Sequence, residues 1–253
     1  MFTNCASGCK YCKFWANAIT PAAALIVATP ANIRRLVVLS IVSLKESVLT
    51  IIGEKNTSKT ALYLPPSLFL NMGQSMRVNV LRVLYVISAR LFDNPKEVYS
   101  KREEVLKLAE ALGLSELRDF FQEADGGSIE AHRVEMFELA PRCPPYGGYY
   151  ALGEDSRERG LYMHQILTYY KALGFTMDVR RELPDYLPVM LEFLAATSEA
   201  EGASAQVRRD FYRRFIKPWF PKFKKCVEES KSPYRHIVNL LQRLFDEEFE
   251  AGE

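Results

Sequence analysis

E-L-P-D-Y-L-P-V-M-L-E-F-L-A, residues 182–195, is the stretch that sets the fold class we expect. Pro184 suits the first position of a helix, where a missing N–H costs nothing. Asp185 would then place a negative charge at the positive end of the helix dipole. A stripe of apolar residues follows at helical spacing, namely Leu187, Met190, Leu191 and Leu194. We therefore expect a core helix from Pro184 to about Ala200.

The same helical pattern extends in both directions over residues 76–253. Apolar residues recur at spacings of three and four, and glycine, proline and serine mark the ends. Pro141–Tyr150, rich in proline and aromatic residues, is expected to be a loop packed on the core. The pattern predicts an all-α, helical-bundle-like domain of seven or eight helices. Their expected bounds are 77–91, 95–112, 116–123, 129–139, 155–173, 184–200, 204–229 with a kink or break at Pro218 and Pro221, and a last helix after Ser232-Pro233.

Charge divides the chain near Met76. Residues 1–75 carry 7 basic and 2 acidic residues, whereas residues 76–253 carry 26 and 29. The acidic second part argues against nucleic-acid binding. Arg208-Arg209 with Arg213-Arg214 form the basic cluster on which a DNA-binding or scaffold function would depend, but a solvated helix face explains them better in a net acidic domain.

Residues 1–75 are treated as an N-terminal extension of uncertain structure. One hypothesis is that Met76 is the natural start. Ala18–Ile33 is apolar but is interrupted by prolines, so we expect neither a transmembrane helix nor a signal peptide.

Two motifs in this extension leave an alternative function open. Cys5, Cys9 and Cys12 resemble the cluster loop of radical S-adenosylmethionine enzymes, without the strand that should precede it. Gly53–Thr60 resembles a P-loop, but Pro65-Pro66 would break the helix that must follow. The alternative is an N-terminal iron–sulfur or nucleotide-binding enzyme module fused to a helical regulatory domain.

Residues 76–253 show no constellation typical of an enzyme. None of the three histidines lies near another histidine or a cysteine, which predicts no metal site and no cofactor. Cys143 and Cys226 are interpreted as buried inert thiols, and the odd total of five cysteines favours a reducing compartment over a disulfide framework. We expect a binding protein.

An ordered set of motifs between Phe137 and Leu194 resembles a known family. They are Pro144-Pro-Tyr146 with Tyr149-Tyr150, Gly153-Glu-Asp-Ser-Arg157-Glu-Arg159-Gly160, Tyr169-Tyr170, Gly174-Phe175, and Glu182-Leu-Pro184-Asp185-Tyr-Leu187 with Leu191-Glu-Phe193. The set is similar to that of the molybdoenzyme assembly chaperones, namely the nitrate reductase delta subunit type (NarJ) and its relatives TorD and DmsD. The resemblance covers about residues 76–253. Tyr186, where the TorD and DmsD branch has a histidine, favours the nitrate reductase branch.

The resemblance implies a cytoplasmic, non-enzymatic chaperone, monomeric or dimeric. It would bind the apo catalytic subunit of a molybdenum oxidoreductase, including its N-terminal twin-arginine-type segment, before the cofactor is inserted, and delay membrane targeting. A peptide with apolar residues and two arginines fits an apolar groove with an acidic rim. The predicted client-binding residues are Glu182, Pro184, Asp185, Tyr186, Leu187, Tyr146, Tyr149, Tyr150, Asp155 and Arg157.

Overall fold

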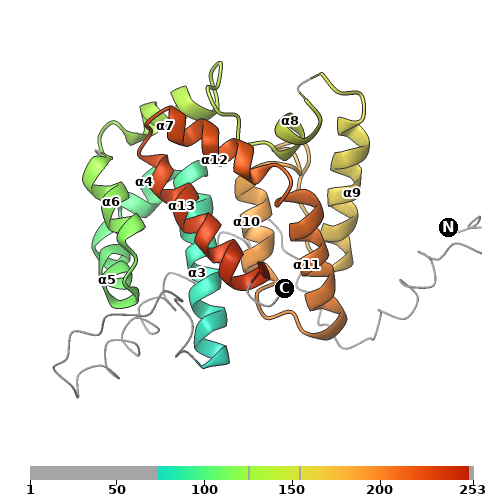
Figure 1. Ribbon diagram of the computed structural model, residues 1–253, viewed down its shortest axis with the longest axis horizontal. Helices are drawn as coiled ribbons and strands as arrows, with labels where there is room; N and C mark the ends of the chain where they lie inside the picture. Colours follow the sequence, from blue (N-terminus) through green and yellow to red (C-terminus); the bar gives the residue numbers. More distant parts are fainter. Residues whose placement is uncertain (1–72, 125, 154, 251–253) are drawn as a thin grey trace, which may run out of the picture.

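The computed structural model describes residues 73–124, 126–153 and 155–250, and these residues form an all-α fold (Figure 1). The all-α prediction is confirmed, because none of the described residues forms a β-strand. The described chain contains the following helices: α3 (Gln74–Asp93), α4 (Pro95–Tyr99), α5 (Arg102–Leu112), α6 (Ser115–Glu123), α7 (Ile129–Phe137), α8 (Gly147–Leu152), α9 (Arg159–Ala172), α10 (Leu187–Ala196), α11 (Gly202–Phe215), α12 (Phe220–Glu229), α13 (Tyr234–Phe245) and a π-helical turn, η1 (Asp246–Glu250).

Helices α3 and α10 pack along each other at the centre of the molecule (Figure 1). Helices α4 to α7 lie on one side of this pair, whereas α8, α9 and α11 lie on the other. Helix α13 packs on α6 and α3, and α12 packs on α13. The core around α10 is aromatic, since the rings of Tyr170, Phe193 and Phe211 lie 4.6–5.6 Å apart by centroid.

The helix built on the decisive stretch begins later than predicted. Helix α10 starts at Leu187, and Pro188 occupies its first turn, which contains no acidic residue. In a helix that began at Pro184, residue 188 would have to donate its N–H to the carbonyl of Pro184. Pro188 has no N–H, and its ring would clash with that carbonyl. That carbonyl instead accepts a hydrogen bond from the hydroxyl of Tyr170 at 2.9 Å. Asp185 therefore precedes the helix and does not lie in its first turn.

The seven or eight expected helices become eleven α-helices over the described residues. The helix expected over 95–112 is divided after Tyr99, and part of the loop expected over 141–150 forms α8. Gly202 begins α11 instead of ending the preceding helix, which stops at Ala196. Gly113 ends α5 in the left-handed conformation with φ of 64°, as predicted from the glycine.

The two cysteines of the helical part form a disulfide bond. Cys143, in the α7–α8 loop, is bonded to Cys226 in α12, with the Cα atoms 5.9 Å apart. The interpretation of both residues as inert thiols is therefore wrong, and so is the expectation, drawn from the odd number of cysteines, that they would not pair. They are 83 positions apart in sequence, so no local spacing pattern could reveal the pairing.

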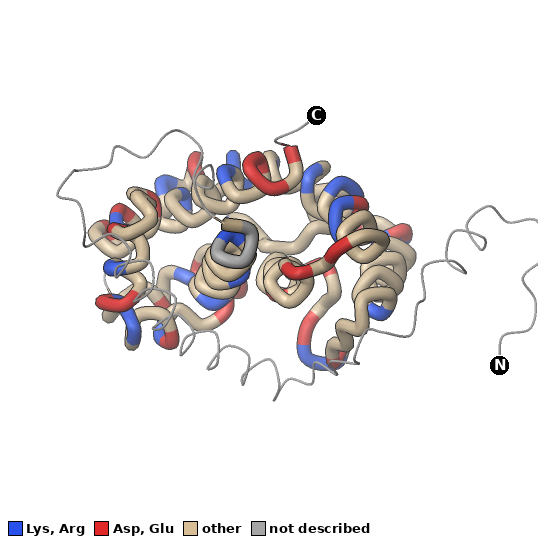
Figure 2. The backbone as a smooth tube through the Cα atoms, turned by 90° about the horizontal axis from the view of Figure 1, so that it is seen from below, with Lys and Arg blue, Asp and Glu red and all other residues tan. Residues whose placement is uncertain are grey.

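The basic cluster on α11 is not one solvated face. Arg208 is buried and donates hydrogen bonds to Glu248 at 2.6 Å and to the hydroxyl of Thr197 at 2.8 Å. In the view of Figure 2, acidic and basic residues are interspersed along the outer helices. The cysteine motif, the P-loop-like stretch and the proposed boundary near Met76 rest on residues 1–75, most of which lie outside the described residues.

Candidate functional site

The residues predicted to bind a client lie mainly on two segments that run side by side. Residues 144–148 and 183–187 are joined by an isolated antiparallel bridge between Tyr146 and Tyr186. The N–H of Gly147 donates to the carbonyl of Asp185, and the N–H of Leu187 donates to the carbonyl of Pro145, each at 2.8 Å. The fold thus brings together two motifs that are separated in sequence.

Asp185 lies beneath this paired backbone and is fully buried. Its Oδ2 atom accepts a hydrogen bond from the N–H of Gly148 at 2.9 Å and pairs with Nη2 of Arg159 at 3.3 Å. The expectation of an exposed rim acid at this position is therefore wrong. The carboxylate instead holds the start of α8 against the segment that leads into α10.

Glu182 is the acid that stays near the surface. Its Oε1 atom accepts hydrogen bonds from the hydroxyl of Tyr146 at 3.2 Å and from the N–H of Leu183 at 2.8 Å. Partial burial raises the pKa of Glu182, and these two hydrogen bonds oppose the rise. The ring of Tyr146 stacks on Tyr186 with a centroid distance of 5.1 Å, so an aromatic pair adjoins the carboxylate.

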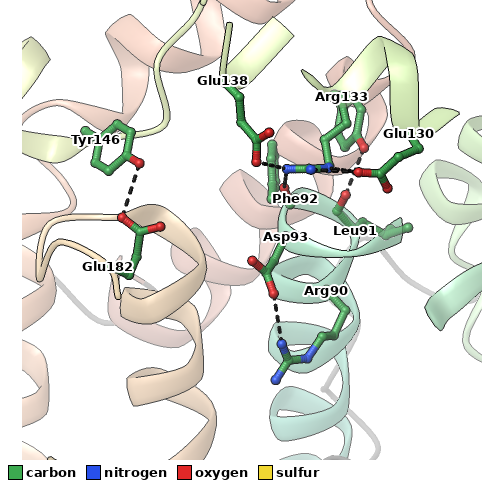
Figure 3. Close-up of polar contacts among 10 residues, drawn as sticks. Arg90, Leu91, Phe92, Asp93, Glu130, Arg133, Glu138, Tyr146 and Glu182 are labelled. Atoms are coloured by element: carbon green, nitrogen blue, oxygen red, sulfur yellow. Dashed lines mark hydrogen bonds and ion pairs between the residues drawn. The ribbon is translucent and has the colours of Figure 1, made fainter. Parts of the chain in front are cut away.

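Two further carboxylates lie close to Glu182 and Tyr146, and the sequence analysis did not predict them. Asp93, at the end of α3, raises the pKa of Glu182 and of Tyr186, after the larger effect of burial in each case. Glu138, just after α7, likewise adds to the effect of burial on the pKa of Tyr146. Figure 3 shows both near the Tyr146–Glu182 pair. The sequence signal at Asp93-Asn94-Pro95 indicated a helix end, and nothing in it indicated proximity to Glu182.

We call Asp93, Glu138, Glu182 and Tyr146 the acidic surface. Two arginines hold parts of it in place: Arg133 pairs with Glu138 at 2.7 Å, and Arg90 pairs with Asp93 at 3.1 Å (Figure 3). Two of its acids are each followed in the sequence by an exposed leucine. Leu139, which follows Glu138, is 73% exposed, and Leu183, which follows Glu182, is 36% exposed. The acidic surface therefore combines negative charge, an aromatic ring and exposed leucines.

The other predicted site residues lie elsewhere or are covered. Pro184 and Leu187 are buried. Tyr150 stacks on Trp219 at 6.0 Å and contacts Phe223 of α12, and the ring of Tyr149 packs against Tyr150. Asp155 and Arg157 are exposed in the α8–α9 loop. Of the ten predicted residues, the structure unites Glu182, Pro184, Asp185, Tyr186, Leu187 and Tyr146.

The described part of the chain shows neither a metal centre nor a membrane span. No three of its His, Cys, Asp and Glu side chains gather in a way that could hold a metal ion. None of its helices combines the length and the apolar character that crossing a membrane would require.

Comparison with known proteins places the chain in a family. Residues 105–225 match the family model described as "Nitrate reductase delta subunit". The chain is 30% identical over 141 residues to the probable nitrate reductase molybdenum cofactor assembly chaperone NarJ of Bacillus subtilis (strain 168). The aligned residues cover 53% of this chain and 72% of that protein. The chain belongs to the nitrate reductase delta subunit family.

Two further relatives have related names. The nitrate reductase molybdenum cofactor assembly chaperone NarJ of Escherichia coli (strain K12) is 28% identical over 171 residues, covering 66% of this chain and 68% of that protein. The chlorate reductase assembly chaperone protein of Ideonella dechloratans is 25% identical over 130 residues, covering 47% of this chain and 67% of that protein. The region matched by the family model includes Glu138, Tyr146 and Glu182.

Proposed function

We propose that this protein is a system-specific assembly chaperone and not an enzyme. It binds the apo catalytic subunit of a molybdenum oxidoreductase, such as a nitrate reductase, in the cytoplasm. By holding the subunit, it assists insertion of the molybdenum cofactor and delays membrane targeting. The observation that carries this proposal is the acidic surface, which lies largely within the part of the chain matched by the family model.

The chemistry of the acidic surface suits a peptide that is both apolar and basic. Carboxylates pair with arginine side chains through charge-assisted hydrogen bonds, and the tyrosine ring offers a face for a guanidinium group. The exposed leucines Leu139 and Leu183 provide apolar contact beside these charges. The proposed ligand is therefore the N-terminal twin-arginine-type segment of the client subunit.

Capture of the partner from native extract tests the proposed function. The tagged full chain is purified from its own cells, and the bound proteins are identified by mass spectrometry. We expect the catalytic subunit of a molybdenum oxidoreductase, and metal analysis should show that the captured subunit lacks molybdenum. Recovery of a fully loaded enzyme, or of no such subunit, would contradict the proposal.

A titration then tests the acidic surface. The N-terminal peptide of the captured subunit is added to the wild type and to Glu182→Gln, which preserves the size of the side chain and an acceptor for Tyr146. Loss of the charge should weaken binding by about fivefold. Glu110→Gln removes an exposed acid from α5 and is the matched control. Equal affinities for the wild type and both variants would exclude Glu182 from the binding surface.

A further inference from the structure

Arg159 connects the buried carboxylate to the acidic surface. It is the first residue of α9, and its side chain remains 22% exposed. Its Nη2 atom contacts Oδ2 of Asp185 at 3.3 Å. Its guanidinium carbon lies 5.8 Å from the centre of the Tyr146 ring. One arginine therefore spans the buried acid and the exposed aromatic ring.

The position of Arg159 is not explained by helix stability. A cation at the first residue of a helix faces the positive end of the helix dipole, which disfavours it. The contacts that Arg159 makes with Asp185 and Tyr146 must outweigh this repulsion. These are the same kinds of contact that an arginine of a bound peptide would make.

The pair between Arg159 and Asp185 is incomplete on both sides. Asp185 Oδ1 and Arg159 Nε are buried, and neither has a hydrogen-bond partner among the residues that the structure describes. A guanidinium can approach a carboxylate with two parallel N–H groups and satisfy both oxygens. Arg159 donates to one oxygen alone, and a buried carboxylate oxygen without a donor costs free energy. Asp185 could therefore bind a better-placed guanidinium more tightly.

We propose that Arg159 is an internal competitor that occupies the place of an arginine side chain of the client. When the client binds, its guanidinium takes over Asp185 and the face of Tyr146, and Arg159 turns outward into solvent. This proposal rests on the proposed function, since it assumes a client segment that contains arginine. It gives Asp185 a role in recognition even though the free protein buries it.

The competition has two consequences for binding. Part of the affinity for the client is spent on displacing Arg159, so the apparent affinity is lower than that of an open site. The site also discriminates between cations, because lysine cannot supply two parallel N–H groups to the carboxylate. A segment with arginine at the critical position should therefore displace Arg159 better than one with lysine.

Arg159→Met tests the competition, because methionine retains an apolar chain of similar reach and removes the charge. The probes are a capped Leu/Ser peptide with a central Arg-Arg pair and its Lys-Lys counterpart, titrated into the full chain. We expect the variant to bind the Arg-Arg peptide about fivefold more tightly than the wild type, with a smaller gain for Lys-Lys. Arg181→Met is the control for net charge, since Arg181 is 74% exposed and lies 3.7 Å from Asp178.

The outcomes separate this proposal from the proposed function. If the wild type binds the Arg-Arg peptide but Arg159→Met binds it no better, or if Arg181→Met gains as much, Arg159 is not a competitor, and the proposed function stands. Binding by neither protein overturns the competition, whereas the proposed function is then decided by capture of the client subunit.

A measurement on the wild type covers the case in which the variant fails to fold. With ¹⁵N-labelled arginine, the Nε–H signal of Arg159 should shift toward that of a solvated arginine as the Arg-Arg peptide is added. Saturated binding with an unchanged signal overturns the proposal.

Discussion

Gly148 lies where the structure has no room for a side chain. A Cβ atom there would sit 2.8 Å from Asp185 Oδ2 and 3.1 Å from Cγ of Arg159. Gly148→Ala should therefore displace the buried carboxylate and lower the free energy of unfolding by about 1–3 kcal/mol. Denaturant unfolding followed by circular dichroism measures the change.

Gly160→Ala is the matched control in the next helix. A Cβ atom at Gly160 meets nothing within 4 Å, so alanine should leave stability unchanged or raise it by up to about 1 kcal/mol through the smaller entropy of the unfolded chain. Equal losses in the two variants would show that the contact with Asp185 does not matter.

For single residues, the sequence correctly predicted which side chains lie together at the site, but it predicted the wrong burial for one of them. Glu182, Asp185 and Tyr146 were chosen together, and the structure brings them together. Asp185 was expected at the surface as part of the acidic rim of a client-binding groove. Its burial depends on Gly148 and Arg159, which approach from other segments, and a local sequence pattern carries no information about them.

The disulfide links the α7–α8 loop to α12 through two cysteines that are 83 positions apart in the sequence. It fastens the loop before Tyr146 to α12, so it restricts both the unfolded chain and the loop. Replacing Cys143 and Cys226 by serine should lower the free energy of unfolding by about 2–4 kcal/mol. Unfolding curves with and without a thiol reductant check this: the reductant should destabilise the wild type and leave the double variant unchanged. A wild type that is insensitive to complete reduction would contradict the expected contribution.

Glu192 makes the packing of α10 on α3 dependent on pH. Its carboxylate pairs with Arg90 at 2.7 Å, yet burial outweighs this pairing and raises the pKa of Glu192 to about 7. Between the ordinary pKa of 4.5 and this value, the folded protein binds more protons than the unfolded chain. Stability should therefore fall as the pH rises through this window, by about 3 kcal/mol.

Glu192→Gln should flatten this dependence, because the amide does not titrate. Thermal unfolding at a series of pH values between about 4 and 8 measures it. Glu199→Gln serves as control, since Glu199 is 67% exposed and pairs with Arg82 at 2.7 Å. If Glu192→Gln retains the slope of the wild type, other groups cause it.

Helix positions could be predicted at the scale of the element, but their ends were less certain. Periodic apolar residues located α10, whereas its start was misplaced because the prediction began it at Pro184, and the proline in its first turn is Pro188. Only one of two prolines four positions apart can begin a helix that continues through both. The geometry of the loop decides between them, since Leu187 donates to the carbonyl of Pro145.

For the whole molecule, the sequence was sufficient for the class of fold and insufficient for the arrangement of helices. Apolar residues at helical spacing, without the apolar–polar alternation of strands, predict an all-α domain whichever way the helices pack together. The central contact between α3 and α10 cannot be read in that way. That contact is what brings Asp93 close to Glu182, and it explains why Asp93 was missed.

Binding of the client should stabilise the whole fold, because the acidic surface joins residues of the central helix pair to a residue that follows α7. Asp93 ends α3, Glu138 follows α7, and Glu182 precedes α10. A ligand that contacts all three binds the folded chain and not the unfolded one. At about 100 times Kd the stabilisation is about 2.7 kcal/mol, which raises Tm by about 5–10 °C.

A thermal shift titration with the N-terminal peptide of the captured subunit measures this stabilisation. The increase in Tm should grow with the logarithm of peptide concentration and be smaller for Glu182→Gln at the same concentration. A peptide that binds without raising Tm would have equal affinity for the folded and unfolded chains. Such a peptide would be recognised by its sequence alone, and the arrangement of the three acids by the fold would then play no part in recognition.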